Sequence, residues 1–136
     1  YLKIIFFVMF FFNFAYAEKN YFVEGEKLFA EKKFNDARFK FEQDILYNPK
    51  NEKSYLYLAK IFKNLKKGDL EENNLKTVIL LNPKNEEAIY YLTLINIEKS
   101  NFSRAKELIS ILEKVCDNFC NQKVELDKKL KNSLKQ

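Results

Sequence analysis

The sequence contains no histidine and no tryptophan, and its 136 residues include only two glycines and two prolines. Without histidine there can be no Ser-His-Asp or Cys-His nucleophile arrangement and no imidazole ligand for a metal ion. Two glycines cannot form a glycine-rich phosphate-binding loop. The scarcity of glycine and proline also favours helices over a turn-rich β architecture. These absences predict an all-α protein that is not an enzyme and holds no cofactor and no metal ion.

One enzymatic alternative remains open, a hydrolase that uses a pair of acids. The 19 acidic residues are spread along the chain among 24 lysines and arginines. That pattern is typical of pairs that solubilise helix faces, so the acid-pair alternative has little support.

The N-terminal segment, residues 1–17, differs in character from the rest of the chain. Lys3 is followed by an apolar run at 4–12, and an Ala-x-Ala sequence ends at Ala17. This order is typical of a secretory signal peptide, so we expect cleavage after Ala17 and export, into the periplasm of a bacterium. The alternative is a membrane anchor formed by residues 4–17. The apolar run is short for a membrane-spanning helix, which needs about 20 residues.

The two cysteines, Cys116 and Cys120, are separated by one turn of a helix. On a continuous helix their Cα atoms would lie about 6 Å apart, near the upper end of disulfide geometry. An exported chain meets an oxidising compartment where disulfides persist, which favours a bond between the two. Two free thiols remain the alternative. A catalytic pair is disfavoured because redox motifs usually have a shorter, Cys-x-x-Cys spacing.

A pentapeptide occurs twice: residues 48–52 and 82–86 both have the sequence Asn-Pro-Lys-Asn-Glu, with the two prolines at positions 49 and 83. Proline disfavours helical geometry in the preceding residue, asparagine can cap a helix, and glutamate favours a helix start. The pentapeptide therefore marks the boundary between helical hairpins. We call the interval from position 49 to position 83 the repeat period. An interval of this length predicts stacked units rather than a single closed core.

Apolar residues recur at helical spacing between these boundaries. They predict three hairpins at residues 18–51, 52–85 and 86–119, followed by a helix at 120–136 that caps the array with an apolar inner face. Gly25 lies inside the first helix, where glycine usually permits close approach by another element. Gly68 is expected to adopt the left-handed geometry that ends the third helix.

The chain resembles the tetratricopeptide repeat (TPR) family of helix-turn-helix units, whose repeats have the same length as the period found here. The first hairpin supplies residues of the types that the family favours at these positions: Tyr21, Gly25, Leu28, Phe34, Ala37, Phe41 and Pro49. The departures are Glu24 in place of leucine, Glu71 in place of a small residue, Thr93 in place of Gly or Ala, and Asp117 in place of proline. The resemblance implies an α-solenoid of three TPR hairpins plus a C-terminal capping helix.

The resemblance also implies a function, because the first helices of TPR units line a concave groove that binds peptides or partner helices. Some members hold acidic C-terminal peptides in a carboxylate clamp, which is not expected here because Phe22 and Glu26 stand where it would begin. The groove positions correspond to Phe22, Val23, Glu26, Leu56, Tyr57, Lys60, Tyr90, Tyr91 and Leu94, with Phe29, Lys63, Asn64 and Ile97 beside them.

The sequence thus predicts a non-catalytic scaffold or adaptor of the cell envelope that binds another protein or a peptide. One alternative is a homo-oligomer that self-associates through the same groove. Another, with less support, is a basic module for anionic surfaces, suggested by the lysines of residues 120–136. Nucleic acid is not expected as a partner of an exported chain, and a membrane is expected only through an uncleaved N-terminal segment.

Overall fold

The structure is a computed structural model that describes residues 20–135, so the predictions for residues 1–17 lie outside the described residues. In that part of the chain every regular element is a helix, which confirms the all-α prediction. The helices are α2 (Tyr21–Ala30), α3 (Phe34–Tyr47), α4 (Glu52–Asn64), α5 (Gly68–Leu81), α6 (Glu86–Glu98), α7 (Phe102–Val115) and α8 (Cys120–Ser133).

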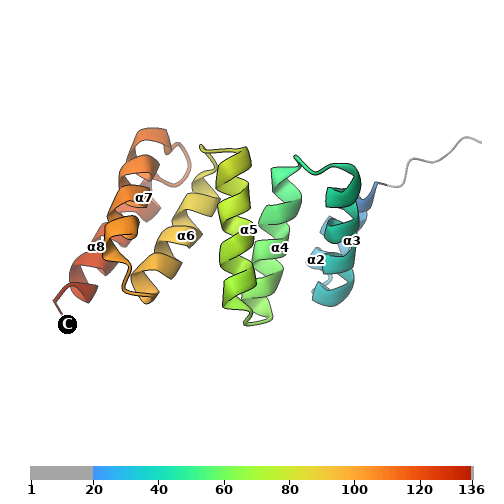
Figure 1. Ribbon diagram of the computed structural model, residues 1–136, viewed down its shortest axis with the longest axis horizontal. Coiled ribbons are helices and arrows are strands. Elements are labelled where there is room, and N and C mark those ends of the chain that lie inside the picture. The colour runs from blue at the N-terminus through green and yellow to red at the C-terminus, as the bar shows by residue number, and fades with distance from the viewer. Residues whose placement is uncertain (1–19, 136) are drawn as a thin grey trace, which may run out of the picture.

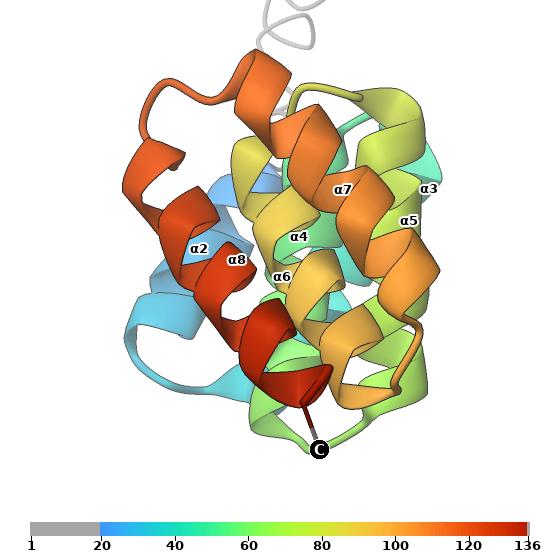
Figure 2. The same cartoon turned by 90° about the vertical axis from the view of Figure 1, so that its left-hand side faces the viewer.

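The helices pair as the antiparallel hairpins α2–α3, α4–α5 and α6–α7, which stack side by side in chain order with α8 at the end (Figure 1). Seen from that end, α3, α5 and α7 form one layer, and α2, α4, α6 and α8 form the other (Figure 2). Each helix packs mainly against its neighbours in sequence. This is the predicted α-solenoid.

The repeat is visible in the backbone at the end of each hairpin's first helix. Lys32, Lys66 and Ser100, each one repeat period after the last, have positive φ angles of 59°, 57° and 58°. In each turn the following N–H donates to a carbonyl in the last turn of the helix, as Lys67 N does to Phe62 O at 2.8 Å. This is the double hydrogen-bonding pattern of a Schellman motif, which places its left-handed residue at a fixed position.

The expectation for Gly68 is therefore wrong. Gly68 is the first residue of α5, and no glycine in residues 20–135 has a positive φ. Lys66 adopts the left-handed conformation because the hydrogen bonds that end α4 place this conformation at position 66, two residues before the glycine. The N-cap of α5 is Lys67 and has no side-chain cap.

Gly25 does allow a close approach, as predicted. An added Cβ at Gly25 would lie 2.8 Å from Cε1 of Phe41, well inside van der Waals contact. Phe41 is fully buried and its ring stacks on Tyr57 at 4.8 Å between centroids. The missing side chain thus lets α2 and α3 pack around this ring.

Gly25→Ala is expected to destabilise the protein by about 1–3 kcal/mol, the usual cost of overpacking. This loss outweighs the gain of about 1 kcal/mol that alanine brings over glycine within a helix. Gly68→Ala is the matched control, because no atom lies within 4 Å of its added Cβ. Urea unfolding followed by circular dichroism measures both, and equal effects at the two glycines would contradict the packing account.

The two identical pentapeptides make different contacts. At the first junction Asp44 is 3% exposed and accepts hydrogen bonds from Ser54 Oγ at 2.5 Å, Asn51 Nδ2 at 2.7 Å and Asn48 Nδ2 at 3.0 Å. At the second junction, one repeat period later, Val78 and Ala88 stand in place of Asp44 and Ser54, and both are fully buried. There Asn85 caps α6 by accepting from Ala88 N at 3.0 Å.

The last helix, α8, continues the register of the repeats. Leu58, Leu92 and Leu126 follow one another at the repeat period and are all buried, so α8 occupies the place of a first helix in a further unit. Apart from Val124, which is 66% exposed, its outer face is polar: Asp127 stands at the position of Thr93 in α6 and pairs with Lys123 at 2.9 Å. A polar outer face is what a solenoid cap needs.

The turn between α7 and α8 is held by a disulfide across it and by hydrogen bonds from its backbone. Cys116 and Cys120 form a disulfide with Cα atoms 5.2 Å apart. Between them, the backbone N–H groups of Asp117, Asn118 and Phe119 donate to Glu86 Oε2 at 2.8, 3.1 and 2.8 Å. Glu86 lies at the start of α6, so one carboxylate ties this turn to the preceding hairpin.

A candidate binding hollow between the first helices

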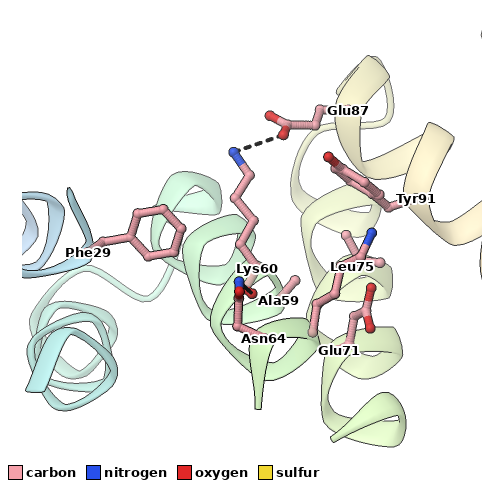
Figure 3. Close-up of a pocket in the computed structure, with 9 residues that line it drawn as sticks. Phe29, Ala59, Lys60, Asn64, Glu71, Leu75, Glu87 and Tyr91 are labelled. Carbon is pink, nitrogen blue, oxygen red and sulfur yellow. Dashed lines mark hydrogen bonds and ion pairs between the residues drawn. The ribbon is translucent and has the colours of Figure 1, made fainter. Parts of the chain in front are cut away.

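The layer of first helices contains a hollow of about 330 Å³. It lies between α4 and α6, which pack against their partners within each hairpin more than against each other. Figure 3 shows its side chains pointing inward from several helices. The lining residues are Phe29, Ala59, Lys60, Lys63, Asn64, Glu71, Leu75, Glu87 and Tyr91.

Two lysines of α4 reach toward α6 rather than into solvent. Lys60 Nζ forms an ion pair with Glu87 Oε1 at 2.8 Å across the hollow (Figure 3). Lys63 Nζ lies 4.3 Å from the centre of the Tyr91 ring, within cation–π range. These long side chains span the gap and make its walls half apolar and half charged.

Glu71 enters the hollow from α5 and has an unusual environment. Burial raises the pKa of its carboxyl, and the charge of Lys63 partly opposes this shift. The pKa of the next residue, Glu72, is shifted in the opposite direction, because hydrogen bonds from Lys76 and Lys99 lower it. Lys99 Nζ lies 2.6 Å from Glu72 Oε2.

We expect Glu71→Gln to stabilise the protein at neutral pH, by at most about 1 kcal/mol for a partly buried site. A carboxyl whose folded pKa is raised disfavours folding when ionised, and this penalty disappears as the pH falls through that pKa. The gain should therefore shrink on acidification. Glu72→Gln is the control and should have the opposite sign, since its lowered folded pKa adds stability at neutral pH that is lost in acid. Thermal unfolding from neutral to acidic pH measures both.

Two of the predicted groove residues, Phe22 on α2 and Tyr57 on α4, belong to an aromatic cluster. Tyr57 contacts Phe22 and Phe29 edge-to-face at 5.9 and 5.1 Å, and its hydroxyl donates to Glu26 Oε1 at 3.0 Å. Burial, and then the bond to Glu26, raise the pKa of Tyr57. Its ring also stacks on Phe41, so this part of the predicted groove packs against the core of the first hairpin.

The predicted positions on α6 divide between two directions. Tyr91 lines the hollow, whereas the hydroxyl of Tyr90 donates to Glu125 Oε1 of α8 at 3.4 Å. Leu56 and Leu94 are half-buried against the main core. Val23, on α2, is 53% exposed. Of the nine predicted residues, Lys60 and Tyr91 line the hollow itself.

The hollow also contains residues that sequence reasoning did not place there: Ala59, Leu75, Glu71 and Glu87. The sequence marked Glu71 as unusual, because a small residue is usual at its position, but that departure indicated altered packing rather than a binding site. Nothing in the sequence marked Glu87, because its role depends on a lysine of the preceding hairpin that reaches across to α6.

Within residues 20–135, no cluster of three or more His, Cys, Asp or Glu side chains is placed to hold a metal ion. None of the helices described there has the length and apolarity needed to cross a membrane.

No family model and no curated protein matches this sequence. Solved structures do match. The first TPR domain of Spaghetti (RPAP3), bound to the HSP90 peptide SRMEEVD, is 19% identical with a TM-score of 0.73, covering 85% of this chain and 94% of that one. The Yersinia enterocolitica secretion chaperone SycD, in complex with a YopD peptide, is 12% identical with a TM-score of 0.72 and coverages of 84% and 89%.

The TPR domain of Sgt2 from Aspergillus fumigatus is also similar, with 16% identity, a TM-score of 0.70 and coverages of 85% and 80%. At these identities the likeness concerns the fold. The chain has the fold of a TPR domain, as the resemblance in its sequence implied.

Proposed function

We propose that this protein is a non-catalytic protein-interaction module that binds a peptide or partner helix along the layer formed by α2, α4, α6 and α8. The hollow between α4 and α6 carries the proposal, because it combines aromatic walls with charged groups on a concave face. Sites for ligands are typically concave, largely apolar and supplied with a few placed polar groups. The RPAP3 and SycD domains, which share the fold, are bound to peptides in their own structures.

The charges of the hollow favour a mainly apolar guest over an acidic C-terminus. Lys60 is already paired with Glu87, and Lys63 lies over Tyr91 with Glu71 nearby. Desolvating a paired lysine for a new carboxylate would sacrifice the existing ion pair. A segment with aliphatic or aromatic side chains would instead use Phe29, Tyr91 and the exposed Val23.

The site of action that we propose is the cell envelope, in the periplasm of a bacterium, with residues 1–17 removed as a signal peptide. The apolar run and the Ala-x-Ala ending at Ala17 support this location. Intact-mass measurement of protein recovered from the envelope tests it. A mature chain that begins at Glu18 is expected, and a chain that retains residues 4–17 would instead support the anchored form.

A pulldown from an envelope extract tests binding at the groove. Val23→Glu places a charge on the exposed apolar part of the proposed surface, and the partner should be lost. Phe39→Glu is the matched control, because Phe39 is 57% exposed against 53% for Val23 and lies on α3 in the other layer. Retention of the partner by both variants, or loss by both at unchanged stability, would contradict binding at the groove.

Self-association through the same groove is the second candidate, since three units and a cap are near the minimum for a stable solenoid. Light scattering during size-exclusion chromatography separates the two. A monomer at all concentrations is expected from the interaction module, and a dimer that Val23→Glu dissociates would favour self-association.

A further inference from the structure

The second hairpin carries two charged residues at positions that are apolar in other hairpins. Glu71 stands one repeat period after Ala37 and one before Ala105, and both alanines are fully buried. Lys63 stands one repeat period before Ile97, which is 4% exposed. Both charged residues line the hollow between α4 and α6. The hollow therefore contains a pair of charges that the packing of the repeat does not require.

These two charges do not meet in an ion pair. Within residues 20–135, neither Lys63 nor Glu71 forms an ion pair, and the carboxylate of Glu71 accepts no hydrogen bond. The ammonium of Lys63 lies over the ring of Tyr91 instead, 4.3 Å from its centre, and acts on Glu71 only through its charge. Glu71 and Tyr91 enter the hollow from α5 and α6 (Figure 3). The hollow thus holds a carboxylate that no described group binds directly.

Two acidic side chains act on Tyr91. Burial raises the pKa of its hydroxyl, and the charges of Glu87 and Glu71 raise it further. Glu87 is already engaged in the ion pair across the hollow, and Glu98, which also acts on Glu71, pairs with Lys129 at 3.8 Å. Glu71 is therefore the acid that is left to bind a further cation. The face of an aromatic ring attracts a positive charge, and a carboxylate beside it adds to that attraction.

Lys63 occupies this place only loosely. It is exposed and lies in the last turn of α4. A cation–π contact at an exposed site is weak, so the flexible side chain of Lys63 can turn into solvent when a guest arrives. An arginine is better suited to the place than a lysine. Its flat guanidinium stacks on an aromatic ring and can bind a carboxylate through two parallel hydrogen bonds.

We propose that the hollow binds one arginine side chain of the partner, whose guanidinium replaces Lys63 over Tyr91 and pairs with Glu71. The methylene groups of this arginine pack against the apolar lining of the hollow. The inference rests on the proposed function and narrows it, because the guest segment is mainly apolar but carries an arginine. An arginine leaves the ion pair across the hollow intact, whereas an acidic guest would compete with it.

Two tripeptides that differ in one charge test the proposal. The first is Leu-Arg-Phe, acetylated and amidated at its ends, and the second has citrulline, whose neutral urea group has the shape of the guanidinium, in place of arginine. The isotope-labelled protein is used in the form recovered from the cell, and shifts of its amide resonances measure binding. The arginine peptide should shift the resonances around Glu71 and Tyr91. It should bind about tenfold more tightly than the citrulline peptide, as expected for a hydrogen-bonded charge pair.

Three variants assign the preference to the hollow. Glu71→Gln should bind the two peptides equally. Lys63→Gln should bind the arginine peptide more tightly than the unmodified protein does, because it removes the competing cation. Glu72→Gln is the matched control and should keep the preference, since Glu72 is the next residue on α5 but is held by Lys76 and Lys99 outside the hollow.

Equal binding of the two peptides by the unmodified protein, or no binding of either, would overturn this inference. It would also be overturned if Lys63→Gln bound the arginine peptide no better, because Lys63 and Glu71 would then only compensate each other's charge. None of these results touches the interaction module itself, which fails only if the natural partner is retained by the Val23→Glu protein.

Discussion

Phe41→Ala is expected to lower the free energy of unfolding by about 3–5 kcal/mol, the usual loss for a fully buried aromatic side chain. Phe41 is 0% exposed and is the ring around which the first hairpin packs. Its ring stacks on Tyr57 of α4 and contacts Phe22 of α2 edge-to-face at 5.8 Å. Removing it leaves a cavity beside Gly25, which has no side chain with which to fill it. A loss of this size is a large fraction of the stability of a small domain.

Equilibrium urea unfolding monitored by circular dichroism measures this loss. Phe39→Ala is the control on the same helix, because Phe39 is 57% exposed and its loss should stay within about 0.5 kcal/mol. The double variant Gly25→Ala/Phe41→Leu should be more stable than the sum of its single changes, since the smaller side chain makes room for the new Cβ. Additive single effects would show that Gly25 and Phe41 are not packed as described.

Asp44→Ala is expected to destabilise the protein by about 2–4 kcal/mol, because it removes three hydrogen bonds to a buried carboxylate and takes the acceptor from the buried hydroxyl of Ser54. The donors are Asn48, Asn51 and Ser54. Asp44 forms no ion pair within residues 20–135, so the side-chain partners of its carboxyl oxygens there are these three hydrogen-bond donors. The loss should appear in the junction between the first two hairpins.

The second junction supplies the control for this prediction. The double change Asp44→Val/Ser54→Ala copies the residues found at the equivalent positions of the next unit, Val78 and Ala88. Replacing a donor and its acceptor together by apolar groups of similar shape is far less harmful than removing one of them. The double variant should therefore be more stable than Asp44→Ala alone. If it is equally unstable or worse, the hydrogen bonds do not account for the role of Asp44.

The repeat period explains why so much of the fold could be predicted from the sequence. Leu58, Leu92 and Leu126 occupy the same buried position because each packs one helix onto the preceding unit. Glu24 stands at the same register on α2, the first helix that the structure describes, and pairs with Lys40. Glu24 therefore replaces the leucine usual at this position in a helix that has no preceding unit among the described residues to pack against.

Features that depend on two distant groups could not be predicted in the same way. Gly68 looked like the left-handed residue of its turn, but the hydrogen bonds of Lys66 and Lys67 back to α4 decided the geometry. The pentapeptides mark both boundaries between hairpins, as predicted, but the contacts of their asparagines depend on residues outside them, Asp44 in one case and Ala88 in the other. For the hollow, the position of Lys60 on α4 was predictable, whereas its pairing with Glu87 needed the spacing between helices.

Site-specific photo-crosslinking tests the central proposal most directly, namely that the layer of first helices binds a partner. A photoreactive phenylalanine analogue is placed at Val23 or at Val124, which occupies in α8 the repeat position of Tyr90 and is 66% exposed. The controls carry the analogue at Phe39 and Leu70, outside that layer. We expect one and the same crosslinked protein from positions 23 and 124 and none from the controls. Crosslinks to that protein from position 39 or 70 alone would contradict it.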